Sequence, residues 1–82
     1  MANYYSYLLK CSDGSFYAGY TNDLKSREKK HNDGLGARYT RGRLPVKVVY
    51  FEEHLNRSEA MKRESEFKKM SRAKKSSLCN LV

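Results

Sequence analysis

Two short alternating segments joined by a turn constrain this fold more than any other feature of the sequence. Residues 3–11 (NYYSYLLKC) and residues 15–20 (SFYAGY) are rich in tyrosine and alternate along their length, which is typical of β-strands. The intervening Ser12-Asp13-Gly14 sequence is a turn signal. We therefore expect an antiparallel hairpin at this end of the chain, against which the remaining elements must pack.

The length of the hairpin loop decides which residues face each other across the two strands. A two-residue loop would pair Lys10 with Tyr17, whereas a three-residue loop with Gly14 in the left-handed conformation pairs Leu9 with Tyr17. A shift of one residue turns every side chain of a strand to the opposite face of the sheet. We expect the three-residue loop.

The three-residue loop has a consequence for the tyrosines. It places Tyr7, Tyr17 and Gly19 on one face of the hairpin, whereas the shorter loop places the two tyrosines on opposite faces. A glycine opposite Tyr7 would leave room for a close approach to the backbone. Tyrosine is also a good strand former, so ordinary hairpin packing explains these side chains equally well at this point.

The rest of the chain predicts three helices and one further strand. We expect first a helix over residues 23–32, capped by Thr21 or Asn22, and then an arginine-rich connection. A strand over residues 46–52 follows, and then a helix over residues 56–69 with a capping-box start. The last helix is expected to run from residue 72, capped by Ser71, to about residue 81. The strand at 46–52 (VKVVYFE) is apolar on both faces and is expected to be covered on both sides. Leu78, Leu81 and Val82 are expected to hold down the last helix. The order ββαβαα predicts an α+β fold with a small, three-stranded, mostly antiparallel sheet and packed helices.

Length and charge narrow the classes of function. The 82 residues predict a single domain spanning 1–82. Seventeen Lys and Arg against nine Asp and Glu give a formal net charge of +8, which favours nucleic acid as the partner. No long apolar run or secretory signal is visible, and the two cysteines lack the spacing of a zinc site. We expect a cytoplasmic protein with reduced thiols, no membrane contact and no obligate protein partner.

Glu64 stands where a hydrophobic residue is expected. Ala60, Met61 and Phe67 recur at helical spacing and predict a buried stripe, and Glu64 falls within that stripe. A carboxylate in such a place must pair with a cationic side chain, bind a metal cation or shift its pKa. The residues alone leave an ion pair with an arginine and a bound cation both open.

The helix at 23–32 has one large apolar residue, Leu24, so its inward side must include Arg27 or His31. An inward arginine is either neutralised by a salt bridge, with Glu64 as a candidate, or available to bind a phosphate through two hydrogen bonds. His31 is a candidate helix-end cap, hydrogen-bond donor or proton carrier.

The connection between the second and third strands is the candidate nucleic-acid surface. Arginines interleaved with an aromatic residue suit backbone phosphates and a stacking surface, although a solvated mobile loop has the same composition. The residues expected to contact nucleic acid are Arg38, Tyr39, Arg41 and Arg43, together with Lys68 on the following helix.

These elements together resemble a known family. The ordered set is Tyr5-Ser6-Tyr7, Tyr17-Ala18-Gly19, Arg27, His31 and Glu64, and it resembles the GIY-YIG nuclease domain from the first strand through Lys69. The sequence from Tyr17 to Val46 is particularly similar to the small stand-alone bacterial members. The first motif departs from the family pattern at its glycine and aliphatic positions, and Ala18 replaces Val or Ile, but none of these positions carries a reacting side chain.

The resemblance implies roles for individual residues. Tyr7 and Tyr17 correspond to the two motif tyrosines and Gly19 to the motif glycine. Arg27 corresponds to the essential helix arginine, and His31 to a frequent histidine. Glu64 corresponds to the glutamate that binds one divalent cation, Mg²⁺ or Mn²⁺. Asn80 is the one candidate for the late asparagine of the family.

The resemblance also implies an activity. The chain is expected to be a metal-dependent DNA endonuclease that selects flapped, branched or single-stranded DNA, with RNA left open as a substrate. In this scheme Arg27 binds the scissile phosphate, Tyr7 or His31 accepts the proton of the attacking water, and Tyr17 orients the water or the phosphate. The alternatives are a nucleic-acid-binding module with the same fold and little or no cleavage, and a protein-interaction adaptor whose basic surface is incidental.

Overall fold

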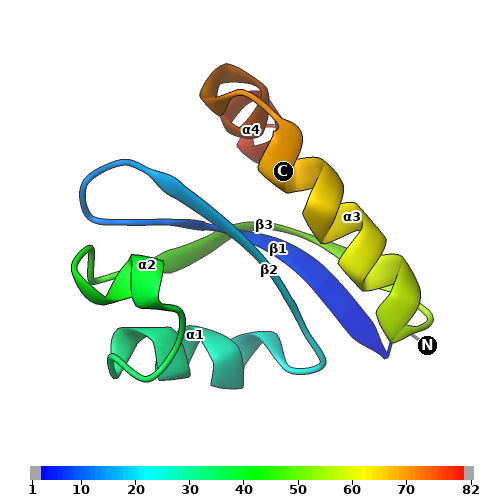
Figure 1. Cartoon of the computed structure of the whole chain (residues 1–82), viewed down its shortest axis with the longest axis horizontal. Helices are drawn as coiled ribbons and strands as arrows, with labels where there is room; N and C mark the ends of the chain where they lie inside the picture. Colours follow the sequence, from blue (N-terminus) through cyan, green and yellow to red (C-terminus); the bar gives the residue numbers. More distant parts are fainter. Residues whose placement is uncertain (1–2, 81–82) are drawn as a thin grey trace.

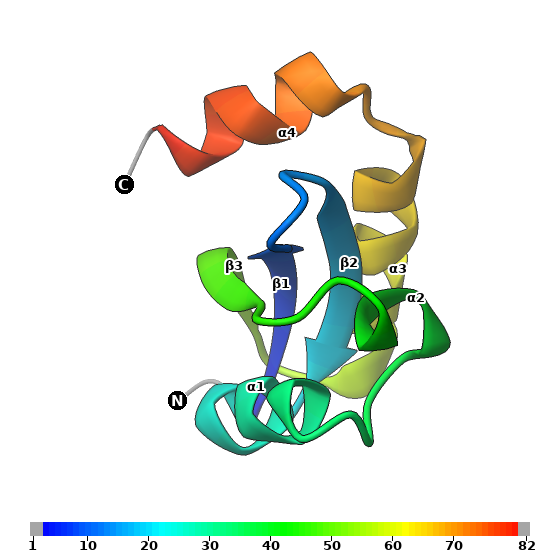
Figure 2. The same cartoon turned by 90° about the vertical axis from the view of Figure 1, so that its left-hand side faces the viewer.

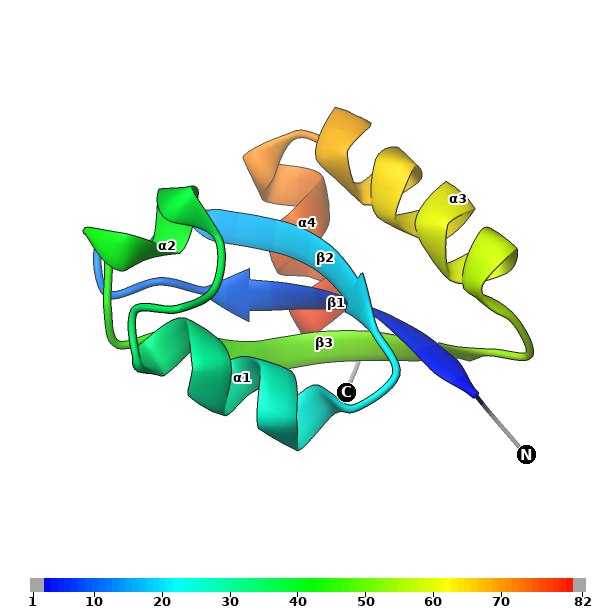
Figure 3. The same cartoon turned by 60° about the horizontal axis from the view of Figure 1, so that its bottom comes forward.

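A computed structural model describes residues 3–80 and contains one three-stranded sheet between two pairs of helices. The strands are β1 (Tyr4–Lys10), β2 (Phe16–Thr21) and β3 (Lys47–His54), and the helices are α1 (Leu24–Asn32), α2 (Arg38–Arg41), α3 (Arg57–Lys69) and α4 (Arg72–Cys79). The strand order is β2-β1-β3, and both pairings are antiparallel. Helices α1 and α2 lie on one side of the sheet and α3 and α4 on the other (Figures 1 and 3). The predicted α+β class is confirmed.

The hairpin has the register predicted for a three-residue loop. Leu9 pairs with Tyr17 and Tyr7 pairs with Gly19. Gly14 has a φ of 83°, the left-handed conformation that closes such a loop. The strand faces follow from this register, so Tyr7, Tyr17 and Gly19 share the face that α1 covers.

Each face of the sheet has its own core, named here for the helix that covers it. The α1 face contains Tyr7, Leu9, Cys11 and Val46, with Tyr17, Leu24, Leu44 and Val48 packed around them. The α3 face contains Leu8, Ala18 and Phe67, with Val49, Tyr50, Met70, Leu78 and Cys79 around them. The central strand β1 therefore supplies buried residues to both cores, as its order in the sheet requires.

The prediction that the third strand is covered on both sides holds in part: Val48 packs on the α1-face core, and Val49 and Tyr50 pack on the α3-face core, but the burial is incomplete. β3 is an edge strand in which no residue is fully buried, and the Phe51 side chain is 47% exposed. Its register against β1 shifts between the Leu8–Tyr50 and Leu9–Val48 pairs, so Val49 is a β-bulge residue. The bulge places Val49 and Tyr50 together on the α3 face, while Val48 faces α1, so the apolar run serves both faces of the sheet.

The helix starts are set by side-chain caps. Asp23 caps α1 by accepting from the Ser26 N–H, in place of the expected Thr21 or Asn22. Asn56 caps α3 and Ser71 caps α4, as predicted.

The buried stripe of α3 is narrower than predicted. Ala60 and Phe67 are fully buried, but Met61 is 43% exposed, because it lies about 100° around the helix from Ala60 and beyond the strands that α3 covers. Leu78 packs on the α3-face core, whereas the expected contacts of residues 81 and 82 lie outside the described residues.

The arginine-rich connection differs from the open loop considered above. Residues 38–41 form the one-turn helix α2, which packs on α1. On the other side of the molecule, α4 lies over the hairpin loop (Figure 2), where Arg72 Nη2 donates to the Gly14 carbonyl at 3.0 Å. Across the part of the chain that the structure describes, no helix combines the length and apolarity needed to cross a membrane.

Candidate active site

Tyr7 lies at the centre of the α1 face and is 2% exposed. Its ring lies over Gly19 on the neighbouring strand, where an added Cβ would be 2.6 Å from the tyrosine Cζ. That separation is too short for two carbon atoms, so the glycine is what allows the ring to occupy this position. The close approach expected at Gly19 is therefore made by Tyr7 itself.

His31 holds the Tyr7 hydroxyl from the helix side. Its Nε2 is 3.1 Å from Tyr7 Oη, and its Nδ1 is 3.1 Å from Thr40 Oγ1 and accepts from the Ala37 N–H at 3.3 Å. The imidazole is fully buried. Burial, followed by the charges of Arg27 and Lys30, lowers the pKa of His31 to about 4, so the ring is neutral at neutral pH.

Tyr17 contacts His31 and Tyr39 through their aromatic rings. The Tyr17 ring centroid is 5.6 Å from that of His31 in an edge arrangement. On its other side Tyr17 stacks on Tyr39 of α2, with centroids 5.9 Å apart and an interplanar angle of 25°. Tyr17 thus lies between the buried histidine and a partly exposed ring.

Arg27 and Glu64 both lie close enough to act electrostatically on Tyr7. Burial raises the pKa of Tyr7, the Arg27 guanidinium opposes this, and the negative charges of Tyr17 and Glu64 add to it. Arg27 has no carboxylate within 4.0 Å among residues 3–80, so the proposed salt bridge to Glu64 is not formed. Its donors are available to an external anion.

Glu64 projects from α3, and its side chain is 19% exposed. Its ion-pair partner is Lys68, with the lysine Nζ 3.6 Å from Oε1, and not an arginine. No cluster of three or more His, Cys, Asp or Glu side chains within the described residues could hold a metal ion. One accessible hard carboxylate that leaves room for water does fit Mg²⁺ or Mn²⁺, because such ions often bind proteins through one or two carboxylates.

The predicted nucleic-acid residues fall into two groups. Arg38 and Arg41 are exposed on α2, and Lys68 is exposed on α3. Arg43 is instead held at the surface by the protein's own groups: its Cζ lies 4.0 Å from the Tyr39 ring centroid and its Nε donates to Asp13 at 3.1 Å. Arg43 supports the stacked aromatic rings, and Arg38, Arg41 and Lys68 keep their charges towards solvent.

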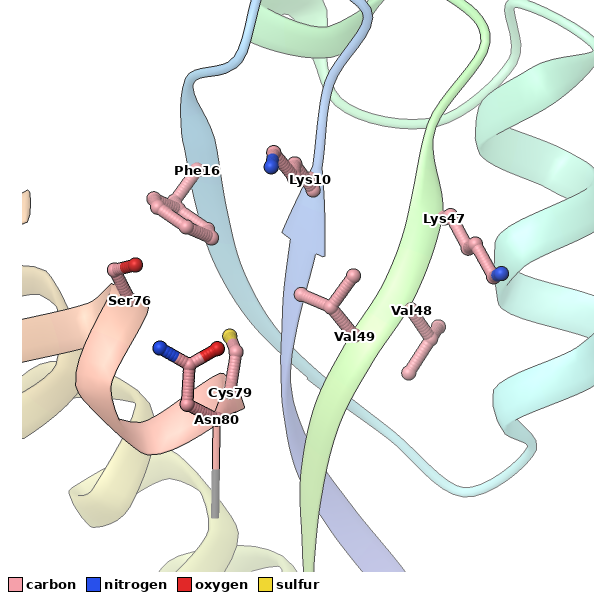
Figure 4. A pocket seen from close by; sticks show the side chains of 8 residues that line it. All are labelled: Lys10, Phe16, Lys47, Val48, Val49, Ser76, Cys79 and Asn80. Carbon is pink, nitrogen blue, oxygen red and sulfur yellow. The ribbon is translucent and has the colours of Figure 1, made fainter. Parts of the chain in front are cut away.

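Asn80 does not join these residues. It ends α4 and lines a hollow of about 430 Å³ together with Lys10, Phe16 and Cys79 (Figure 4). By strand alternation Lys10 and Phe16 belong to the α3 face, opposite Tyr7. The structure therefore brings Tyr7, Tyr17, Gly19, Arg27 and His31 together on the side of α1, places Glu64 of α3 within electrostatic reach of Tyr7, and leaves Asn80 at the hollow beside α4.

Two residues of this site were missed by the sequence reasoning. Thr40 is fully buried against His31, and a Cβ on Gly36 would lie 2.7 Å from the histidine Cγ. Both belong to a basic, glycine-containing connection that gives no periodic signal. The available signal was a small uncharged residue among arginines, which is too common to be informative.

Comparisons with known proteins agree with this arrangement. Residues 3–77 match the family described as the GIY-YIG catalytic domain. A UPF0213 protein of Bacillus licheniformis is 56% identical over 73 residues, covering 89% of this chain and 75% of the relative. The UPF0213 protein YazA of Bacillus subtilis is 52% identical, covering 89% and 74%.

Solved structures show the same fold. The solution NMR structure of a UPF0213 protein from Bacillus halodurans is 49% identical, with a TM-score of 0.59 over 95% of this chain and 83% of that one. A solution NMR structure of a protein from E. faecalis is 45% identical, with a TM-score of 0.60 over 94% and 85%. The chain belongs to the GIY-YIG family.

Proposed function

We propose that this GIY-YIG domain is a metal-dependent DNA endonuclease that acts on flapped, branched or single-stranded DNA. The observation that carries the proposal is a convergence around Tyr7: Tyr7, Tyr17, Arg27 and Glu64 come from four elements, and Arg27 and Glu64 both act on the charge of Tyr7. Arg27 has no acidic partner among the described residues. Selection by shape is favoured because no helix of the fold is dedicated to reading base edges.

In the proposed reaction, Arg27 binds the scissile phosphate. A guanidinium can donate two parallel hydrogen bonds to phosphate oxygens, which fixes the orientation of the group as well as its charge. The basic side chains of α2 and α3 would attract the rest of the strand without reading its sequence.

Tyr7 accepts the proton of the attacking water, and Tyr17 orients the water or the phosphate. Burial and the Glu64 charge raise the pKa of Tyr7, and Arg27 lowers it. A divalent cation at Glu64 would neutralise that carboxylate and stabilise the charge that develops on the phosphate. Tyr7 is therefore held in its protonated, inactive form until the charges around it change, for example when a cation neutralises Glu64.

The alternative is a nucleic-acid-binding module with the same fold and little or no cleavage. It is favoured by the single acidic ligand of the site and by the net charge of +8. Its binding would weaken steeply with salt and would require no metal.

One assay separates the two functions. Wild type, Glu64→Gln and the matched control Glu59→Gln are incubated with branched, flapped, single-stranded and duplex DNA in Mg²⁺, in Mn²⁺ and in chelator. Glu59 is exposed on the same helix as Glu64. We expect metal-dependent product from wild type and Glu59→Gln, and a rate lower by about 10²–10³ for Glu64→Gln, the usual effect of losing one electrostatic contact in a preorganised site. Retention of DNA without product in every metal condition would identify a binding module.

A further inference from the structure

The histidine of the site belongs to a chain of buried hydrogen bonds that extends beyond the reacting groups. Only three polar or charged residues are fully buried within residues 3–80, and two of them, His31 and Thr40, are in direct contact. Thr40 lies on α2, which also supplies the stacked ring of Tyr39. The one-turn helix is therefore connected to Tyr7 through His31.

The backbone fixes the direction of these hydrogen bonds. The Ala37 N–H points at His31 Nδ1, and a backbone amide can only donate, so Nδ1 must offer a lone pair. If Nδ1 carried a proton instead, two N–H groups would face each other and one buried donor would be unsatisfied, at a cost of about 1–3 kcal/mol.

The Thr40 hydroxyl agrees with the same assignment. Its oxygen is 2.8 Å from the Ala37 carbonyl and 3.1 Å from Nδ1, and its one proton can serve either acceptor. The Ala37 carbonyl already accepts from the Thr40 backbone N–H at 3.2 Å. If the hydroxyl proton turns from this carbonyl to Nδ1, the carbonyl keeps the Thr40 N–H as its donor, so in that orientation every donor of the hydrogen-bonded chain has an acceptor.

We infer that Thr40 is a positioning residue which, together with the Ala37 amide, holds His31 in the tautomer protonated on Nε2, so that His31 donates a hydrogen bond to the Tyr7 oxygen. The inference rests on the proposed function for its catalytic meaning, but the tautomer itself is a property of the folded protein. Gly36 serves the same arrangement, because a side chain there would displace the imidazole.

This direction of donation separates two roles that the sequence left open. A histidine that donates to the Tyr7 oxygen cannot take the proton of that hydroxyl through Nε2. It instead stabilises the phenolate form and leaves the hydroxyl proton of Tyr7 directed elsewhere. His31 thus favours the phenolate that Tyr7 must form before it can accept a proton, and His31 does not act as the base.

The tautomer can be measured directly. Long-range ¹H–¹⁵N spectra of the ¹⁵N-labelled protein distinguish a protonated from an unprotonated ring nitrogen, and the chain has two histidines, so His54→Gln assigns the signals. We expect His31 to show protonated Nε2 and unprotonated Nδ1 at neutral pH. A spectrum with protonated Nδ1 would overturn the inference, whether or not the protein cleaves DNA.

Two variants test the part played by Thr40. Thr40→Val removes the hydroxyl at nearly constant volume, and Thr40→Ser keeps it. We expect Thr40→Val to shift His31 towards the other tautomer and to lower cleavage about tenfold, the effect of one hydrogen bond of about 1.4 kcal/mol, and Thr40→Ser to restore both. An unchanged spectrum in folded Thr40→Val would refute the role of Thr40. If wild type does not cleave, the proposed function fails while the spectra still decide the tautomer.

Discussion

The two faces of the sheet each present an arginine, and the two arginines differ in how their donors are used. On the α3 face, Arg63 donates to Glu52 and Glu66 at 2.8 Å each, and its Cζ lies 4.8 Å from the Phe67 ring centroid. On the α1 face, Arg27 has no carboxylate within 4.0 Å among the described residues. A saturated arginine contributes to the fold, whereas one with free donors beside two phenols can bind an external phosphate.

The two faces also differ in the polarity of the side chains that they bury. The α3-face core is apolar and holds Leu8, Ala18 and Phe67. The α1 face buries His31 and Thr40 next to Tyr7, with every buried side-chain polar atom among the described residues satisfied. The comparison teaches that the α3 face serves mainly stability, whereas the α1 face holds the tyrosines, Arg27 and His31 in place. Glu64 is the one proposed reactive group that comes from α3. The following experiments test this division.

The largest effect is expected in the apolar core. Phe67→Ala should lower the free energy of unfolding by about 3–5 kcal/mol, because it removes a fully buried ring and leaves a cavity. Urea unfolding measures this. Met61→Ala on the same helix is the control, and since Met61 is 43% exposed the loss should be much smaller. Equal losses would show that α3 packs through a different face.

The next effect is a pH dependence of stability that originates on the α1 face. The pKa of His31 is about 4 in the folded protein and about 6.5 when unfolded. As the pH falls between these values, the unfolded chain binds a proton that the folded protein does not. The free energy of unfolding should therefore fall by about 3 kcal/mol from pH 7 to pH 4 through this group.

Denaturant titrations at several pH values measure that dependence in two variants. His31→Gln should flatten the curve relative to wild type, and His54→Gln should keep it. Parallel curves for wild type and His31→Gln would show that the imidazole is not held neutral by burial.

Substituting glycine by alanine should have a smaller effect on stability, and one that differs between two positions. Gly19→Ala places a Cβ against the Tyr7 ring and should cost about 1–3 kcal/mol, with loss of cleavage. Gly42→Ala is the control, because an added Cβ meets nothing within 4 Å and its φ is −90°. Thermal unfolding of the two variants should separate them. A neutral Gly19→Ala would mean that the ring moves aside at little cost.

The smallest effect concerns the exposed charges. Arg38→Gln and Arg41→Gln should each reduce the slope of log affinity against log salt by about 1, and the double variant by about 2, since each side chain neutralises roughly one phosphate. Fluorescence anisotropy with labelled branched DNA measures the slope. An unchanged slope in the double variant would place the DNA away from α2.

The sequence predicted the parts of this site that depend on local rules. Loop length and Gly14 determine the hairpin register, and that register brings Tyr7, Tyr17 and Gly19 together. The caps at Asn56 and Ser71 are also local, and both were predicted. Such features need no knowledge of distant residues.

What could not be predicted depends on contacts between distant segments. His31 is buried because α2 closes over it, and a one-turn helix has no periodicity to reveal it. The exposure of β3 depends on strand order, which the apolar pattern of VKVVYFE does not specify. The pairing of Glu64 with Lys68, by contrast, is a local i,i+4 contact within α3, which helical spacing allows without any distant segment.

The most direct test of the division between the faces is the single-turnover cleavage rate of Arg27→Ala beside that of Arg63→Ala, with both proteins checked for folding by circular dichroism. Arg27→Ala should cut about 10²–10³ times more slowly at nearly unchanged stability, whereas Arg63→Ala should lose stability and cut at a rate close to that of wild type. A folded Arg27→Ala protein that cleaves branched DNA at the wild-type rate would contradict the assignment of the α1 face as the phosphodiester site.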